Sequence, residues 1–354
     1  MRLQRHSLPL FYRLRCTLAP ATITIAALLC SACQQQRQTE IRLSGEAQGS
    51  YYSIIYFDNQ HRNLQHDIDS LLHDFDQTAS LWEPESLIRR INDNRDSIAN
   101  TLFADLLNKS NEINLLTDGC YDCTVGKLVK AWGFGFEKST EMTPQRVDSL
   151  RRYCGKPATL NRGADGITTV RKPSPETEID FNAIAQGYSV DLVGRYLEHK
   201  GIGNYIIDIG GEVLAKGCKA DSTHWTIGIE RPSAQRYSSR EIETVITLRD
   251  RAVVTSGNYR KYYEKDGVRY SHTIDPSTGY PVKHTLLSVS VVDTTAWRAD
   301  ALATAFMVMG LQQSLQFLEA HGDEIGVDAV FFIYNENGNY KTYATPAFAE
   351  LVAK

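Results

Sequence analysis

The sequence predicts an α+β fold of mixed helices and strands, and three observations support that class. Short apolar runs typical of strands alternate with stretches of helical periodicity from about Ile41 onward. No repeat of fixed period is visible, and no linker rich in Pro, Gly or Ser is long enough to separate independent domains. With 354 residues, of which 42% are hydrophobic and 23% charged, the chain can bury a sizeable core.

The first predicted elements are a strand and a surface helix. Tyr51–Phe57 reads YYSIIYF, which is typical of a strand, and apolar residues then recur at helical spacing. These apolar residues are Leu64, Ile68, Leu71, Leu72 and Phe75. The stretch 137–177 is polar and contains several prolines, so we expect a surface excursion there.

The second half of the chain predicts a helix, a glycine turn and further strands. An apolar stripe predicts a helix that ends at Gly201, and it consists of Ile184, Tyr188, Leu192, Val193 and Tyr196. The strand NYIIDI follows, and then Gly210-Gly211, where two glycines allow positive φ or a close backbone approach. A simple hairpin or bulge explains these glycines equally well. Later strands are predicted at WTIGIE, ETVITL, LLSVSVV and AVFFIY, and a helix runs from near Arg298 through ALATAFMVMG.

The N-terminal segment predicts export and lipid attachment. Residues 1–32 carry four arginines and no acidic residue, and the apolar run Cys16–Cys30 is too short and too interrupted to span a bilayer. Small residues before Cys33 resemble the bacterial lipobox, in which that cysteine becomes the lipidated first residue; a plain cleaved signal peptide is the alternative. We expect a lipoprotein signal peptide at 1–32, a polar tether at 33–40 and the folded domain at 41–350.

From these features we expect the protein to lie in the bacterial cell envelope, on the periplasmic side of the inner or outer membrane. Removing the four arginines leaves 34 basic and 42 acidic residues, a net charge of −8, so no basic face for nucleic acid is indicated. Four cysteines would remain in an exported compartment, where an even number permits disulfides: Cys120, Cys123, Cys154 and Cys218. The C-x-x-C pair lacks a thioredoxin-like context, so packing or a structural bridge is favoured over a redox centre.

Two patterns could bind a metal ion and an anion. Asp300 and Thr304 lie four residues apart on a predicted helix, so their oxygens can converge, and Mg²⁺ prefers such hard donors. A polar edge of the helix is the more frequent reason for such a pair taken alone. Asp180 precedes a predicted helix whose first turns contain Asn182, Ala183 and Gly187, and free N–H groups there suit an anion such as a diphosphate. Asp180 could instead simply cap the helix.

A third pattern gathers hydroxyl, imidazole and carboxylate groups. Thr255 and Ser256 precede the stretch YSHTIDPSTGYPV, which contains His272 and Asp275. Histidine is the side chain most often used as a base near neutral pH. A histidine that only orients its loop through Asp275 is the alternative.

In this order, these motifs resemble the ApbE family, the FAD:protein FMN transferases or flavin-trafficking lipoproteins. The resemblance extends from about Gly45 to Ala347, through Ser80–Asn92, Asp118–Gly135, Ile179–Asp191, Asp208–Val213, Ala252–Val282 and Ala299–Phe306. It implies a T-fold-related fold with mixed helices and antiparallel sheets in two lobes and the flavin site between them. It also implies Mg²⁺-dependent transfer of FMN from FAD to a Thr or Ser hydroxyl, with release of AMP. The implied partner is a redox-pump subunit or an exported flavoprotein.

The resemblance also assigns roles to residues. It makes Asp300, Thr304 and the carbonyl of Ala183 the Mg²⁺ ligands. It makes His272 the base for the acceptor hydroxyl, with Asp275 beside it. It places a further set at FAD, namely Gln48, Trp82, Trp132, Asp180, Gln186, Thr255, Ser256 and Ile274.

Two departures from the family pattern concern the FAD site. The family usually has Lys at the position of Gln186, so one positive charge near the diphosphate is missing, and Gln48 stands where Met is usual. Two other functions therefore stay open. One is an FAD pyrophosphatase, which gives free FMN and AMP, and the other is a non-catalytic lipoprotein that binds flavin.

Overall fold

An eight-stranded antiparallel sheet forms the centre of the protein. The structure is a computed structural model that describes residues 39–135, 141–232, 241–258, 262–265, 268–327 and 329–353. The strand order is β1-β2-β5-β6-β9-β12-β13-β14, and every neighbouring pair is antiparallel. The bounds are β1 Thr39–Ala47, β2 Ser50–Asp58, β5 Tyr205–Ile209, β6 Glu212–Lys216, β9 Arg251–Gly257, β12 Leu286–Asp293, β13 Ala329–Glu336 and β14 Asn339–Ala344.

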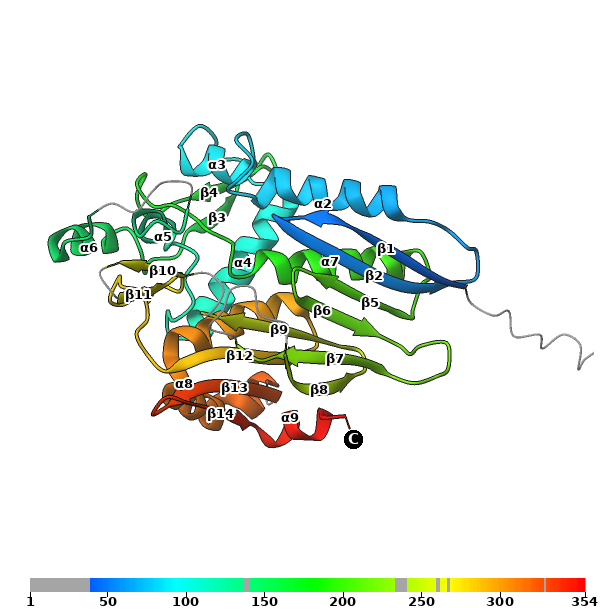
Figure 1. Ribbon diagram of the computed structural model, residues 1–354. Helices are drawn as coiled ribbons and strands as arrows, with labels where there is room; N and C mark the ends of the chain where they lie inside the picture. Colours follow the sequence, from blue (N-terminus) through cyan, green and yellow to red (C-terminus); the bar gives the residue numbers. More distant parts are fainter. Residues whose placement is uncertain are drawn as a thin grey trace, which may run out of the picture.

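Four helices cover one face of this sheet (Figure 1). They are α2 (Gln65–Ala79), α4 (Thr101–Leu116), α7 (Ala185–His199) and α8 (Ala296–Ile325). Their apolar sides share the largest buried cluster with the inward-facing residues of the strands. Burial of apolar surface of this kind is the main stabilising contribution to a fold.

A smaller layer covers the other face. It consists of the hairpin β7 (Trp225–Glu230) and β8 (Ile242–Leu248) and of the short helix α9 (Pro346–Leu351). The rings of Phe331 and Phe348 stack there at 5.0 Å between centroids. Both faces of the central sheet are therefore buried, which explains why its strands alternate weakly between apolar and polar residues.

A second group of elements lies beside one end of the sheet (Figure 1). It contains α3 (Leu87–Asn92), α5 (Gly126–Ala131), α6 (Pro144–Arg151) and the hairpins β3 (Thr159–Arg162) with β4 (Thr168–Arg171) and β10 (Tyr262–Lys265) with β11 (Val268–Ser271). The segment 137–177 was predicted to be a surface excursion, and most of its described residues are exposed, but the helix α6 and the hairpin β3–β4 within it were not predicted. Thr143 caps α6, and Val147 and Cys154 are buried, so a short helix and a hairpin cover a small core of their own.

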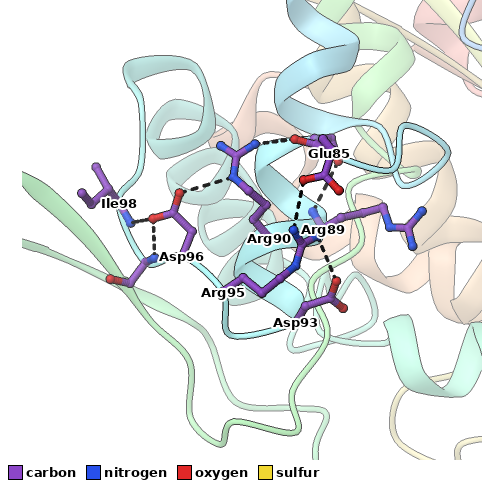
Figure 2. Close-up of polar contacts among 9 residues, drawn as sticks. Glu85, Arg89, Arg90, Asp93, Arg95, Asp96 and Ile98 are labelled. Carbon is purple, nitrogen blue, oxygen red and sulfur yellow. Dashed lines mark hydrogen bonds and ion pairs between the residues drawn. The ribbon is translucent and has the colours of Figure 1, made fainter.

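The loop that follows α3 is held by ion pairs, as Figure 2 shows. Arg95 pairs with Glu85 at 3.0 Å and with Asp93 at 3.3 Å. Arg90 lies 3.4 Å from Asp96 and also donates to the carbonyl of Glu85. These side chains are exposed or half-exposed, so each pair contributes about 1 kcal/mol at most. Their effect is to hold the two sides of α3 together.

Most elements predicted from the sequence are confirmed. The strand at Tyr51–Phe57 is β2, the first amphipathic helix is α2, and the second is α7, which Gly201 follows with φ of +79°. Gly210 and Gly211 form the two-residue turn of the β5–β6 hairpin with φ of +70° and +113°. The first strand begins at Thr39, inside the segment expected to be tether.

The helix α8 is longer than predicted and is broken once. It begins at Ala296, two residues before the expected start, and Gly310 has φ of 75° and ψ of 173°, outside the helical region. Its length and apolar composition would suit a membrane span. However, Asp300, Leu302 and Phe306 are buried inside the protein, so packing against the sheet accounts for the apolar composition.

The described cysteines form no disulfide. Cys120, Cys123, Cys154 and Cys218 are all free thiols. Burial raises the pKa of the Cys120 thiol to about 11 and that of Cys154 to about 12, and it raises the pKa of Cys123 further. Thiols with raised pKa values stay protonated and react slowly, so packing, one of the two roles favoured by the sequence, is what the structure contains.

Candidate active site

The carboxylate of Asp300 is buried in the first turns of α8. Its side chain is 6% exposed, and its Oδ2 accepts a hydrogen bond of 3.0 Å from the backbone N–H of Gly187 on α7. Among the described residues, Asp300 accepts its hydrogen bond from this N–H, and Asp300 forms no ion pair. Burial raises the pKa of Asp300 to about 7. A buried carboxylate without a positive partner is costly and is a suitable ligand for a cation.

Gly187 lets α7 and α8 approach closely enough for this contact. A Cβ atom at Gly187 would lie 2.3 Å from the carbonyl oxygen of Ala296 and 2.8 Å from the Cβ of Asp300. Distances below 3.0 Å to backbone cannot be relieved by a side-chain movement. Position 187 therefore requires glycine for packing, and not because of its backbone angles.

Asp191, one turn further along α7, fixes the start of α8. Its two carboxylate oxygens accept hydrogen bonds from the N–H groups of Ala296 at 3.0 Å and Trp297 at 2.9 Å. Thr295, the residue at the cap position itself, makes no side-chain cap. The first N–H groups of a helix lack partners within it, so a carboxylate from another helix takes that role here.

Hydroxyl groups from β9 lie beside α8. Ser256 Oγ is 3.5 Å from Thr304 Oγ1, and Thr255 Oγ1 is 2.7 Å from Ser290 Oγ on β12. Thr304 is one turn after Asp300 on the same helix. The structure thus brings Ser256, Thr304 and Asp300 to adjacent positions, and each offers a hard oxygen donor.

A second cluster joins the β1–β2 turn to the first turn of α7. Gln48 has φ of 55° in that turn, and its Oε1 accepts from Ser189 Oγ at 3.3 Å. Ser189 Oγ also contacts the carbonyl of Gln186 at 2.8 Å. A Cβ atom at Gly210 would lie 2.4 Å from Nε2 of Gln186, so this glycine of the β5–β6 turn makes room for the amide. Close approach as well as hairpin geometry therefore explains Gly210.

Asp180 lies in the segment that leads into α7. Its Oδ1 accepts from the N–H of Asn182 at 2.8 Å, and its own N–H donates to the carbonyl of Cys123 at 2.7 Å. The helix α7 begins only at Ala185, so the prediction that Asn182 and Ala183 lie in its first turns is wrong. Asp180 does not cap α7; its bond to Asn182 instead stabilises the turn that precedes the helix and contains Ala183. The side chain is 7% exposed, and burial raises its pKa. Burial raises the pKa of the nearby Tyr121 hydroxyl, and the negative charges of Asp300 and Asp180 raise it further. The two carboxylates therefore lie near the same buried tyrosine.

The loop that contains His272 and Asp275 packs against α5 and α6. Ile274 and Trp132 belong to one buried cluster, and Trp132 Nε1 donates to the carbonyl of Gly279 at 2.9 Å. The ring of His272 lies 6.4 Å from that of Phe134, nearly edge to face. Asp275 accepts hydrogen bonds from its own loop, from Ser277 and Thr278, which close the turn.

The two tryptophans differ in their surroundings. Trp132 is 5% exposed and anchors the loop, whereas Trp82 is 59% exposed ahead of α3. An exposed aromatic ring is available to a ligand, while Trp132 can offer an edge at most. The contact of either tryptophan with the flavin of FAD stays a prediction.

The chain is similar in sequence to known proteins of one family. The sequence model of the ApbE family matches residues 48–331. The chain belongs to the ApbE family. A relative from Vibrio cholerae serotype O1, named FAD:protein FMN transferase, is 34% identical over 341 residues, which cover 94% of this chain and 98% of the relative. A relative of the same name from Escherichia coli K12 is 31% identical, with 91% of this chain and 94% of the relative covered.

Solved structures of this family agree with the observed fold. The flavin transferase ApbE from Vibrio cholerae superposes with a TM-score of 0.76 over 89% of this chain and 99% of that one, at 34% identity. The apo form of flavinyl transferase ApbE from Pseudomonas stutzeri gives a TM-score of 0.77 at 31% identity, with 89% and 97% covered. The predicted family and the α+β class are confirmed.

The oxygen donors predicted as metal ligands are of the kinds that Mg²⁺ prefers. Asp300 and Thr304 supply hard oxygens, and the turn 181–184 places the carbonyl of Ala183 just before the α7 turn that bonds to Asp300. In the described part of the chain, no three side chains of His, Cys, Asp or Glu lie close enough together to hold a metal ion by themselves. A set of one carboxylate, one hydroxyl and one carbonyl suits Mg²⁺, which normally keeps water or phosphate oxygens as further ligands.

Sequence reasoning missed four roles at this site. Gly187 was recognised only as part of a helix start, and the cap from Asp191, the bridge made by Ser189 and the contact of His284 with α8 were not foreseen. The first three residues lie within the motif Ile179–Asp191, so the motif carried a signal. Nothing in the motif indicated which partner each residue meets.

Proposed function

We propose that this chain transfers FMN from FAD to a Thr or Ser hydroxyl of a protein acceptor and releases AMP. The buried carboxylate of Asp300 carries the proposal, because it lacks a positive partner among the described residues and lies one turn before Thr304, whose hydroxyl is 3.5 Å from that of Ser256. The relatives named FAD:protein FMN transferase support the same reaction, since they match over nine tenths of the chain.

Asp300, Thr304 and the carbonyl of Ala183 would hold Mg²⁺. When bound, Mg²⁺ supplies positive charge to the oxygens of the FAD diphosphate and to the leaving AMP. The burial of Asp300 favours this role, because a low-dielectric site strengthens the attraction between a carboxylate and a cation. Gly187 and Asp191 hold α7 against the start of α8, the helix that carries Asp300 and Thr304.

The transfer is a substitution at the phosphorus of the FMN half. The oxygen of the acceptor hydroxyl forms a bond to that phosphorus, the bond from phosphorus to the AMP oxygen breaks, and AMP leaves with the electron pair. His272 accepts the proton of the attacking hydroxyl. Most of the catalysis by the chain is then positioning of the two reactants in line.

Two neutral amides take the place of a charged contact with FAD. Gln186 lies in the first turn of α7, and the hydroxyl of Ser189 contacts both its backbone carbonyl and the side-chain oxygen of Gln48. The Nε2 of Gln48 is buried and makes no hydrogen bond among the described residues. Both amides can donate to phosphate or flavin oxygens, which compensates in part for the absence of a lysine at position 186. Asp180, Ile274 and Trp82 would complete the contacts with FAD.

The location of the enzyme is part of the proposal. Cys33, which lies outside the described residues, would carry the lipid that anchors the chain to the envelope membrane. Five residues lie between Cys33 and Thr39, where β1 begins, and the six steps from Cα to Cα extend over about 20 Å at most. The acceptor would accordingly be a protein of the envelope, either a redox-pump subunit or an exported flavoprotein.

One experiment separates this reaction from its rivals. The chain from residue 34 onward is incubated with FAD, Mg²⁺ and an acceptor domain that bears a Thr, and the acceptor mass, AMP and free FMN are measured. Transfer predicts that the acceptor gains one FMN group, which is the mass of FMN less one water, with one AMP released, and that Asp300→Ala or chelation of Mg²⁺ abolishes both. The exposed Asp148→Ala on α6 serves as the matched control and should leave transfer unchanged. AMP with free FMN would instead identify a pyrophosphatase, and intact FAD without AMP a flavin carrier.

A further inference from the structure

His284 closes a break in the helix that carries the metal-binding residues. Its Nε2 lies 2.7 Å from the carbonyl oxygen of Met307, and because a carbonyl only accepts, Nε2 carries the proton. Met307 is three residues after Thr304, and three residues before Gly310, where the helical geometry is interrupted. A break of this kind deprives the carbonyls of the preceding turn of their regular partners.

Two side chains replace those partners. The Nε2 of His284 donates to the carbonyl of Met307, and Ser314 Oγ lies 3.3 Å from the carbonyl oxygen of Phe306. Ser314 Oγ also donates to the carbonyl of Gly310, the break residue itself, at 2.7 Å. A Cβ atom at Gly310 would lie 3.0 Å from Cδ2 of His284, so the imidazole ring packs directly across the break. The part of α8 before the break, 296–309, is called its first arm. The end of this first arm is therefore held by a loop residue outside the helix, His284.

That loop is the one that presents His272. The carbonyl of Thr273 accepts from Val282 N–H at 3.0 Å, and Asp275 N–H donates to the carbonyl of Tyr280 at 2.9 Å, so 273–282 forms a closed unit. His284 follows this unit by two residues. The contact between His284 and Met307 therefore connects the loop of the proposed base to the arm of α8 that bears Asp300 and Thr304.

We propose that His284 is a positioning residue for FMN transfer, which sets the spacing between the loop of His272 and the metal-binding arm of α8. The inference rests on the proposed function. Reacting groups displaced by about 1 Å can lose about a hundredfold in rate, so the loss of one such connection should lower kcat. His284 itself touches neither FAD nor the acceptor in this scheme.

The second ring nitrogen makes the proposal specific. Nδ1 of His284 is buried and makes no hydrogen bond among the described residues, so only the Nε2–H contributes a contact. A glutamine places an N–H donor at nearly the same distance from the backbone as Nε2 and has no counterpart of Nδ1. His284→Gln should therefore preserve the connection, whereas His284→Ala and His284→Asn should lose it.

The test compares these variants at a temperature at which all are folded. We expect His284→Ala and His284→Asn to lower kcat for acceptor modification by about 10- to 100-fold with an FAD Kd within twofold of the wild type, and His284→Gln to retain most of kcat. His224→Ala, at an exposed position before β7, is the control and should behave as the wild type. Unchanged kcat in His284→Ala, or equal loss in His284→Gln, would overturn the inference.

Hydrogen exchange provides a readout that does not depend on the reaction. Peptides that cover 273–284 and 300–309 should both exchange faster in His284→Ala than in the wild type and in His284→Gln. If the wild type transfers no FMN, the proposed function fails, but the exchange data still decide whether His284 connects these segments. Faster exchange in only one of the two peptides would refute the connection.

Discussion

Replacing Asp300 by asparagine is expected to stabilise the metal-free protein at neutral and alkaline pH. The pKa of this buried carboxyl rises from 3.8 to about 7 because of burial, and each pKa unit corresponds to about 1.36 kcal/mol, so the ionised form costs the fold about 4 kcal/mol. An asparagine has nearly the same shape and can still accept the hydrogen bond from Gly187. It carries no charge, and the cost disappears.

The sign of the pH dependence follows from the direction of the shift. Below about pH 4, Asp300 is protonated in both the folded and the unfolded chain, and its ionisation costs nothing. Between about pH 4 and 7 the unfolded chain loses this proton first, so the folded protein becomes less stable as pH rises. Above about pH 7 the full cost applies. The advantage of Asp300→Asn should therefore grow from pH 4 to 7 and stay constant beyond.

Urea unfolding from pH 5 to 8, with EDTA or with Mg²⁺, measures this difference. In Mg²⁺ the wild type should regain stability, because a cation that binds only the folded protein stabilises it by mass action, while Asp300→Asn should respond weakly. The exposed Asp148→Asn should show no pH-dependent difference from the wild type. If Asp300→Asn is no more stable than the wild type at pH 8 in EDTA, the carboxylate has a positive partner and the reasoning about its burial is wrong.

Three further substitutions test the packing around the site. Gly187→Ala should lower the free energy of unfolding by about 1–3 kcal/mol and raise the Mg²⁺ concentration needed for half-maximal activity, since its methyl group would lie 2.3 Å from a backbone oxygen. The control Gly203→Ala faces open space and should change neither quantity. Equal melting temperatures of the Gly187→Ala variant and the wild type would contradict this prediction. Asp191→Asn should destabilise by about 1.5–3 kcal/mol in urea unfolding, because one of its two acceptors for the start of α8 becomes a donor, and an unchanged midpoint would refute the cap. Gly310→Ala should cost about 1–3 kcal/mol, since φ of 75° with ψ of 173° is readily adopted only by glycine; a variant as stable as the wild type would show that the break relaxes.

The sequence was sufficient for most of the secondary structure near the site. The apolar stripe that ends before Gly201 predicted α7, and the Gly210-Gly211 pair predicted a turn, because both patterns depend on contacts within a few residues. The segment 137–177 was predicted to lie at the surface, as most of its described residues do, but its helix and hairpin were not predicted. Its helix α6 buries Val147 against side chains from other parts of the chain, and no local pattern announced that partner.

The candidate residues were named from the sequence, but their arrangement was not. The spacing of Asp300 and Thr304 indicated one helical face, and that is what α8 contains. The contact of Asp300 with Gly187 spans 113 residues, and that of Gln48 with Ser189 spans 141. Family resemblance placed such residues at one site without saying how they are held.

The sequence by itself determined the class, the family and the residue types that the chemistry requires. Periodicity, caps and ordered motifs are properties of short segments, so they can be recognised before the chain folds. Only the tertiary structure decided that Asp300 is buried without a charge partner, that Gly187 lets two helices touch and that His284 closes the break in α8. Burial and close packing arise when distant segments exclude water together, and for that reason a raised pKa or a required glycine cannot be read from one segment alone.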